Sequence, residues 1–224
     1  MFRRRTAHWW LAAYLVASLV NVFVSVRVVD MTSKTLLMPL LLAYFVSSLD
    51  GLRNQLVTCV GVALVFSWVG DLLLMGDGDI FFVLGIAAFL GAQICYIIGF
   101  RPYTALGPLR RRPWLALPYL AYGVLLLALL LPGLGGLAVT VVVYAAALVT
   151  MAVLATGVSP AAAVGGAFFL LSDSLIALTE LSDVLPDGAG AFIMPTYLVG
   201  QLLLVVGVLQ NLGRVRSVRD LLPA

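Results

Sequence analysis

Long apolar runs follow one another along almost the whole chain, and short clusters of turn-forming or charged residues separate them. About 20 apolar residues are enough for a helix to cross the hydrocarbon core of a bilayer. Of the 224 residues, 63% are hydrophobic and 10% are charged, and the mean hydropathy is +1.13. Because a soluble domain is roughly one-quarter charged, one aqueous core cannot accommodate these runs. The sequence therefore predicts an all-α polytopic membrane protein.

The apolar runs predict eight transmembrane helices in a single transmembrane domain that covers residues 1–224. The basic start of the chain, "MFRRRTAHWW", is similar to the first part of a signal peptide. The apolar run after it is long and lacks a small-residue cleavage site, so we expect a retained first helix. The expected spans are residues 9–26, 35–50, 55–75, 80–100, 114–131, 137–156, 162–180 and 193–211.

The distribution of lysine and arginine predicts the orientation of these helices, because short cytoplasmic loops are enriched in both residues. Arg27 and Lys34 fall on one side of the membrane, which also receives the acidic loops around residues 77–79 and 183–187. We therefore expect both termini in the cytoplasm. The dominance of Ala, Leu, Val and Arg suggests a bacterial inner membrane. The opposite, cytoplasmic side receives Arg3, Arg4, Arg5, Arg53, Arg101, Arg110, Arg111, Arg112, Arg214, Arg216 and Arg219.

Several classes of function are disfavoured by the residues present. There is no basic patch with interleaved aromatic residues, so we expect no binding to nucleic acid. His8, in the basic N-terminal flank, is the one histidine of the sequence, which excludes an intramembrane zinc site built on histidines and a histidine-based triad. Cys59 and Cys95 both fall in apolar segments and are expected to be small core residues. We expect neither a metal nor a cofactor, and the oligomeric state is not predicted.

The two halves of the chain are similar to each other. "FSWVGDLLL" in the third expected span matches "FFLLSDSLI" in the seventh, and Gln93 in the fourth aligns with Gln201 in the eighth. Four helices return the chain to its starting side, so a duplicate would have the same orientation and a pseudo-two-fold axis along the membrane normal. Apolar sequence also produces such matches by chance, and both explanations stay open.

Polar side chains recur at helical spacing within several expected spans. Ser67 and Asp71 are four residues apart and share one face of the third span. Tyr197 and Gln201 have the same spacing in the eighth. Such stripes are expected if they face a common interior cavity. Further polar residues at membrane depth are Asn21, Gln93, Tyr96, Ser172 and Asp173.

Each of these residues also has a plainer interpretation. Amides such as Asn21 and Gln93 often form hydrogen bonds that only hold helices together. Asp71 lies near the outer end of its span, where a carboxylate can reach the interface, whereas Asp173 lies deeper. Lys34 is on the outer side, where it suits an interface anchor, a partner for an aspartate or a ligand for a lipid phosphate.

Five segments, in this order, resemble the signature segments of the YhhN-like membrane family, which includes the lysoplasmalogenases. They are "TSKTLLMPLLL", "FSWVGDLLLM", "GIAAFLGAQICYIIGF", "GAFFLLSDSLIAL" and "YLVGQLLLVVGV". The resemblance covers nearly the whole chain and implies an eight-span integral membrane protein. It also implies hydrolysis of the vinyl ether bond of lysoplasmenylethanolamine or lysoplasmenylcholine, which yields a fatty aldehyde and a glycerophospho-base.

The family motifs fall on particular residues of this sequence. The Gly-Asp of the third span falls on Gly70 and Asp71, and the Ser-Asp of the seventh falls on Ser172 and Asp173. The lysine of the second span falls on Lys34. There are two departures from the family pattern. Thr35 replaces a proline, and Gln93 stands where many members have a histidine, so a role of that histidine would be lost or altered here.

The chemistry of the reaction suits a pair of carboxyl groups. Vinyl ether hydrolysis requires a proton on the alkene carbon and then water at the oxocarbenium-like carbon, so a carboxylic acid serves as general acid. A second carboxylate stabilises the cation and activates water, as in glycoside hydrolysis. We expect Asp173 as the proton donor and Asp71 as the base, close together in one site. Asn21, Gln93, Tyr197, Gln201 and Ser172 are expected to orient substrate and water, and Lys34 to attract the phosphate.

Two other classes of function stay open. The aspartates also suit a small-molecule or lipid transporter that uses them for proton coupling. A structural or lipid-sensing protein without turnover is the third interpretation. Release of aldehyde from a lysoplasmalogen distinguishes the enzyme from both.

Overall fold

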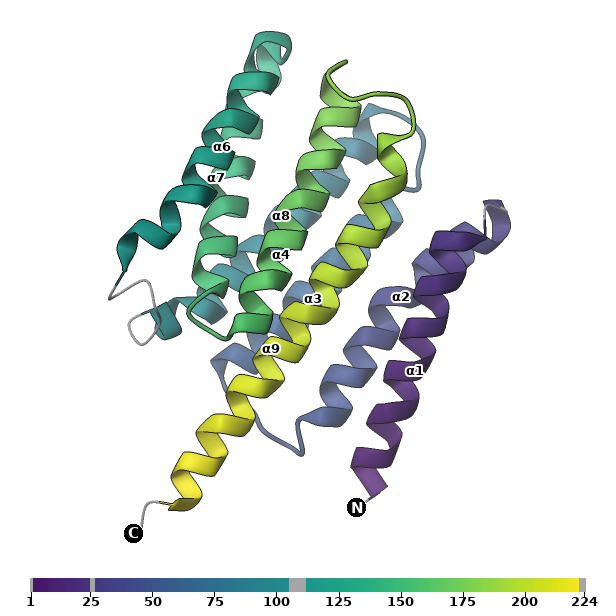
Figure 1. The fold of residues 1–224 in the computed structure, drawn as a ribbon. Helices are drawn as coiled ribbons and strands as arrows, with labels where there is room; N and C mark the ends of the chain where they lie inside the picture. The colour runs from purple at the N-terminus through teal and green to yellow at the C-terminus, as the bar shows by residue number, and fades with distance from the viewer. Residues whose placement is uncertain (1, 25–26, 105–111, 222–224) are drawn as a thin grey trace. The chain divides into compact units, whose positions relative to one another are not determined.

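The computed structural model describes residues 2–24, 27–104 and 112–221, with side chains described over 6–24, 31–104 and 112–214. All regular structure in these residues is helical (Figure 1). This confirms the all-α class. The α-helices are α1 (Phe2–Phe23), α2 (Arg27–Ser48), α3 (Gln55–Leu73), α4 (Asp79–Thr104), α6 (Leu117–Leu130), α7 (Ala138–Ala155), α8 (Pro160–Leu181) and α9 (Ile193–Leu221), with 3-10 turns at Pro113–Ala116, Leu131–Gly133, Gly135–Leu137 and Ala189–Phe192.

Seven segments of the described chain are long and apolar enough to cross a membrane. The helix α2 is not among them: it is 22 residues long, but Lys34 and its polar neighbours lie in its first half. Seven of the eight expected spans thus coincide with helices of membrane length and composition, and the eighth span stays a prediction. The seven segments are Thr6–Phe23, Gln55–Leu73, Asp79–Thr104, Pro113–Gly133, Gly135–Ala155, Pro160–Leu181 and Ala189–Arg214.

The helices extend past the expected spans where polar residues continue them. The helix α2 begins at Arg27, well before residue 35, and α9 continues to Leu221 beyond residue 211. Helical hydrogen bonds satisfy the backbone whatever the side chains are, so a count of apolar residues underestimates helix length. Residues 25–26, at the end of the first expected span, lie outside the described residues, as do Arg110 and Arg111 of the orientation count.

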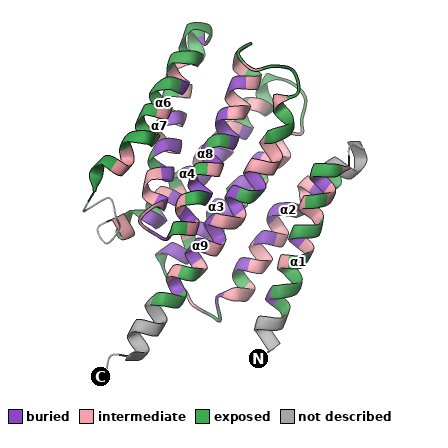
Figure 2. Ribbon diagram, in the orientation of Figure 1, coloured by how far each residue is buried: buried purple, intermediate pink, exposed green. Residues whose placement is uncertain are grey.

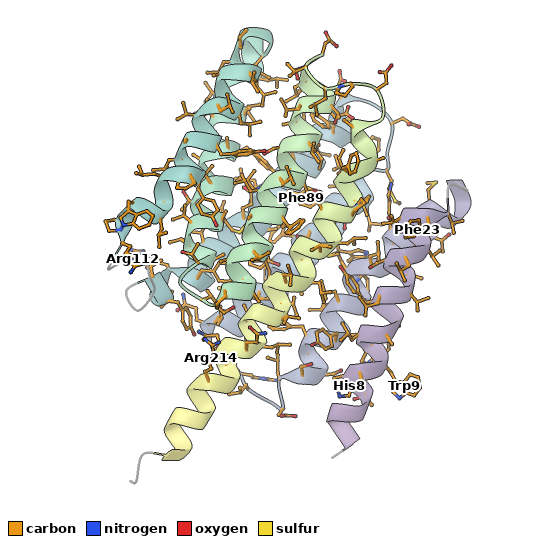
Figure 3. All side chains as sticks on the ribbon, in the orientation of Figure 1. His8, Trp9, Phe23, Phe89, Arg112 and Arg214 are labelled. Atoms are coloured by element: carbon orange, nitrogen blue, oxygen red, sulfur yellow. The ribbon has the colours of Figure 1, made fainter. Side chains whose placement is uncertain are left out.

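Large apolar and aromatic side chains cover the outside of the helices. Trp9, at 77% exposure, projects outward from α1 (Figure 3), and Trp114 is exposed in the 3-10 turn before α6. Figure 2 shows exposed residues along α6, where Leu120 and Val124 are among the exposed apolar residues. An apolar exterior with tryptophans near helix ends is typical of proteins in a bilayer.

The chain divides into two compact units, Met1–Gly99 and Phe100–Ala224. In the first unit, α1 packs along α2, and α2 packs along α3. The helix α3 begins where Oδ1 of Asn54 accepts a hydrogen bond from Val57 N at 2.9 Å, which satisfies one of the free N–H groups at the helix start. The single domain and the internal repeat expected from the sequence stay predictions.

A side chain of α3 completes the backbone hydrogen bonding of α2. Pro39 lies inside α2 and has no N–H, so the carbonyl of Thr35, four residues earlier, lacks its helical donor. Nε1 of Trp68 in α3 donates to this carbonyl at 2.9 Å. An indole N–H therefore replaces the missing peptide N–H and joins the two helices.

In the second unit, α8 lies against α9 with backbone close to backbone (Figure 1). A Cβ added at Gly165 would lie 2.6 Å from Leu204 N, and one added at Gly207 would lie 2.4 Å from Ala162 N. Small residues permit this approach, and close van der Waals packing drives helix association where apolar lipid offers no hydrophobic gain. The α8–α9 pair is thus the tightly packed element that carries Asp173.

Hydrogen bonds also hold the start of α8 and the part of α9 that lies next to it. Ser159 caps α8 by accepting a hydrogen bond from Ala162 N at 3.1 Å, with Pro160 at the first helical position. Nδ2 of Asn211 in α9 donates to Val158 O at 2.8 Å, which connects α9 to the turn before α8. Toward the opposite end of α8, Leu178 packs against Leu126, Leu130 and Leu134.

Candidate functional site

Asp173 is a buried carboxylate in the middle of an apolar helix. Its side chain is 3% exposed, and it lies on the buried face of α8 together with Ser172 and Ser174. Oη of Tyr144, from α7, donates a hydrogen bond to Oδ2 of Asp173 at 2.5 Å. A buried carboxylate without such a donor would cost several kcal/mol, roughly 3 or more. The second unit thus holds a carboxylate at membrane depth with a phenol from the neighbouring helix against it.

The two serines beside Asp173 bind backbone oxygens. Oγ of Ser172 donates to Ile193 O, at the start of α9, at 3.1 Å, and Oγ of Ser174 donates to Leu170 O in its own helix at 2.7 Å. Ser172, expected at the substrate, therefore joins α8 to the first turn of α9. This bond also helps to fix the register between the helix of Asp173 and the helix of Tyr197.

Tyr197 and Gln201 lie on the buried face of α9, as their four-residue spacing predicts. The ring of Tyr197 meets Phe169 edge-on, with centroids 5.9 Å apart. Phe169 lies one helical turn before Asp173 on α8. The structure therefore gathers Asp173, Ser172, Tyr197 and Gln201 on the buried surfaces of the α8–α9 pair.

A second polar cluster lies in the first unit around Asp71. Asp71 is half-buried near the C-terminal end of α3, as the sequence predicts, and Ser67, four residues earlier, is completely buried. Asp71 interacts electrostatically with the buried phenol of Tyr14 in α1, which also interacts with Tyr96 in α4. Gln93, in α4 and three residues before Tyr96, is completely buried as well.

Asn21 and Lys34 belong to the contact between α1 and α2. Nδ2 of Asn21 donates to Oγ of Ser33 at 2.9 Å, and both residues are buried. Lys34, the next residue along the chain, is half-buried. Lys34 thus follows a member of a buried polar pair in the sequence of α2 and belongs to the same unit as Asp71.

The eight expected site residues divide between the two units. Asp71, Lys34, Asn21 and Gln93 belong to the first, and the others belong to the second. The shared site expected for Asp71 and Asp173 stays a prediction. Cys59 and Cys95 are free, half-buried thiols, and the described residues contain no group of three or more His, Cys, Asp or Glu side chains that could hold a metal.

Two tyrosines of these clusters are absent from the site that the sequence predicts. Tyr144 stands alone in the apolar segment "TVVVYAAAL", where no polar spacing marks it. Tyr14 is four residues before Ser18 and seven before Asn21, so helical spacing puts it on the same face as these two polar residues. Their partners lie on other helices, which sequence spacing does not reveal.

A model of the YhhN family matches residues 29–208 of the sequence. The chain belongs to the YhhN family. The matched segment runs from α2 into α9 and includes both aspartates, whereas Asn21 and Tyr14 precede it. No curated protein and no solved structure matches the sequence.

Proposed function

We propose that this YhhN-family protein hydrolyses the vinyl ether bond of lysoplasmalogens, that is, of phospholipids with a single alkenyl chain. The products are a fatty aldehyde and glycerophosphoethanolamine or glycerophosphocholine. The observation that carries the proposal is the family match, whose range contains both intramembrane aspartates. The buried position of Asp173 in a helix of membrane length supports it, because the reaction requires a carboxyl group as general acid at the depth of the lipid chain.

In the proposed reaction Asp173 delivers its proton to the alkene carbon that lies farther from the ether oxygen. The π electrons form the new C–H bond, and the oxygen lone pair stabilises the adjacent carbon as an oxocarbenium ion. Asp71 removes a proton from the water that adds to this carbon. Asp173, now ionised, takes the hydroxyl proton of the resulting hemiacetal while Asp71 gives its proton to the departing ether oxygen, so aldehyde and alcohol form and both carboxyl groups regain their starting states. The reaction consumes one water and requires no cofactor.

The remaining expected site residues bind and orient in this proposal. Lys34 attracts the phosphate, and the Asn21–Ser33 pair beside it holds the polar part of the lipid. Gln93 in the first unit, and Tyr197, Gln201 and Ser172 in the second, orient water and the ether segment. The apolar exterior of the helices suits a protein whose substrate resides in the bilayer.

The test uses purified protein in detergent with lysoplasmenylethanolamine as substrate and aldehyde release as readout. The matched substrate control is the same lipid with a saturated alkyl ether, which lacks the alkene that accepts the proton. Asp71→Asn and Asp173→Asn should each lower kcat about 100-fold or more, since general acid–base catalysis contributes about 10²–10⁴-fold. Asp183→Asn is the control, because Asp183 is exposed in the loop between α8 and α9. Near-normal turnover in both aspartate variants would refute the mechanism.

The alternative is a small-molecule or lipid transporter in which the two aspartates carry protons. Their place in otherwise apolar helices is the observation in its favour. Uptake into proteoliposomes that depends on Asp71 and Asp173, with no aldehyde released in detergent, would establish transport and overturn the hydrolase.

We also infer eight spans, with α2 as the eighth, in a bacterial inner membrane and with both termini in the cytoplasm. The alternation of charge supports this orientation: Arg53 lies in the α2–α3 connection, whereas Asp77 lies in the α3–α4 connection. A single cysteine introduced at Arg53, in a cysteine-free background, should react with a membrane-impermeant maleimide only after the cells are opened. A cysteine at Asp77 should react in intact spheroplasts. The opposite pattern would reverse the topology.

A further inference from the structure

We infer that Tyr144 is a positioning residue of the proposed hydrolase: it holds Oδ2 of Asp173, directs the transferable proton to Oδ1 and stabilises the carboxylate as that proton leaves. This inference rests on the proposed function. The observation behind it is the hydrogen bond that joins Oη of Tyr144 in α7 to Oδ2 of Asp173 in α8.

The direction of the hydrogen bond determines which oxygen can be acidic. A phenol O–H donates to a carbonyl-type oxygen, so the oxygen that accepts from Tyr144 is the C=O oxygen when Asp173 is protonated. The acidic proton then belongs to the other oxygen, Oδ1. Tyr144 thus turns two equivalent oxygens into one acceptor and one donor, and it fixes the direction from which Asp173 can reach an alkene carbon.

The same bond acts differentially on the reaction. When Oδ1 gives its proton to carbon, negative charge spreads over both oxygens of Asp173. Hydrogen bonds to a charged acceptor are about twice as strong as those between neutral groups. The Tyr144 contact therefore strengthens as the proton leaves, which lowers the barrier, whereas it makes no comparable change in substrate binding.

The burial of the two residues agrees with this division of roles. Asp173 is buried, but Tyr144 is only half-buried, and Val143 beside it is exposed on the outer surface of α7. The phenol therefore reaches from the partly exposed side of α7 to the buried carboxylate and keeps water away from Oδ2 on that side.

A purely structural role is the competing explanation, because any buried carboxylate needs a donor. The two roles predict different kinetics. A positioning residue changes kcat and leaves KM nearly unchanged, since its contribution arises in the transition state. A structural residue changes the fraction of folded protein, and the folded molecules keep the normal kcat.

The test compares Tyr144→Phe with Tyr122→Phe, which removes the same hydroxyl from a half-buried tyrosine of the adjacent helix α6. With lysoplasmenylethanolamine as substrate and rates normalised to folded protein, Tyr144→Phe should lower kcat about 10- to 100-fold, the effect of losing one hydrogen bond to a charged group. Its KM should stay within about twofold, and Tyr122→Phe should match the wild type. A normal kcat in Tyr144→Phe would overturn the inference.

A second substitution preserves the fold and the bond. 3-Fluorotyrosine at position 144 keeps the shape of the ring but is a stronger hydrogen-bond donor, so it should raise kcat above that of the wild type. An unchanged kcat would also overturn the inference, because a structural contact is insensitive to this change.

An infrared measurement separates this inference from the proposed function. The carboxyl band of Asp173, assigned as the band that is lost in Asp173→Asn, should shift in Tyr144→Phe and not in Tyr122→Phe. Absence of aldehyde release by the wild-type protein would refute the hydrolase, and the positioning role with it. Normal aldehyde release together with an unshifted band would refute the role of Tyr144 alone.

Discussion

Substituting alanine for Gly165 should separate α8 from α9 and destabilise the second unit. The added Cβ would lie 2.6 Å from Leu204 N and 2.9 Å from Gly200 O, and both are backbone atoms that cannot rotate away. Ordinary contact begins at 3.4 Å, so the two helices would have to move apart by roughly 0.8 Å at this point. Overpacking of this kind typically costs about 1–3 kcal/mol.

The matched control is Gly61→Ala in α3, where an added Cβ meets no atom within 4 Å. There the substitution should be neutral or stabilising by up to about 1 kcal/mol, because alanine favours a helix more than glycine does. Gly165→Ala receives the same helical benefit, so the difference in the free energy of unfolding between the two variants reports the α8–α9 contact alone. Gly61→Ala should be the more stable variant by about 1–3 kcal/mol.

The assay is reversible unfolding in mixed micelles of increasing dodecyl sulfate content, followed by far-ultraviolet circular dichroism. A difference of 1.4 kcal/mol is tenfold in the unfolding equilibrium constant, so the expected effect is readily measured. Equal stability of the two variants would show that α8 and α9 do not approach each other as closely as the backbone distances state.

Further predictions concern α2 and substrate binding. Trp68→Phe should lower the free energy of unfolding by about 1–3 kcal/mol in the same assay, because it leaves the Thr35 carbonyl without a donor. The loss should be smaller in a Pro39→Ala background, where residue 39 regains its N–H. Equal losses in both backgrounds would refute this role of Trp68. Lys34→Gln should raise KM for lysoplasmenylethanolamine about tenfold with little change in kcat, because it removes a charge-assisted contact with phosphate. An unchanged KM would exclude Lys34 from headgroup binding.

Much of the fold follows from the sequence, because the bilayer imposes long apolar helices and every backbone group must find its partner within them. Seven of the expected spans coincide with helices of membrane length. The second span is harder to predict, since Lys34 and its neighbours lower the hydropathy of a helix that begins at Arg27. Side-chain spacing predicts that Asp71 shares a face with Ser67, because four residues make about one turn.

Contacts between helices are what the sequence does not reveal. The hydroxyl of Tyr144 meets a carboxylate 29 residues further along the chain, and nothing in its apolar neighbourhood indicates the pairing. Likewise, the sequence alone suggests that Trp68 is an aromatic membrane residue and that Pro39 marks a helix kink. Their connection through the Thr35 carbonyl depends on how α2 packs against α3.

The indole bridge between α2 and α3 also has a mechanical consequence. Thr35 follows Lys34 directly, and Trp68 precedes Asp71 by less than one helical turn. A proline leaves a helix with a weakened point about which it can bend, and here the bridge attaches that point to the neighbouring helix. The bridge therefore ties a bend of α2 at this point to α3, the helix that carries Asp71.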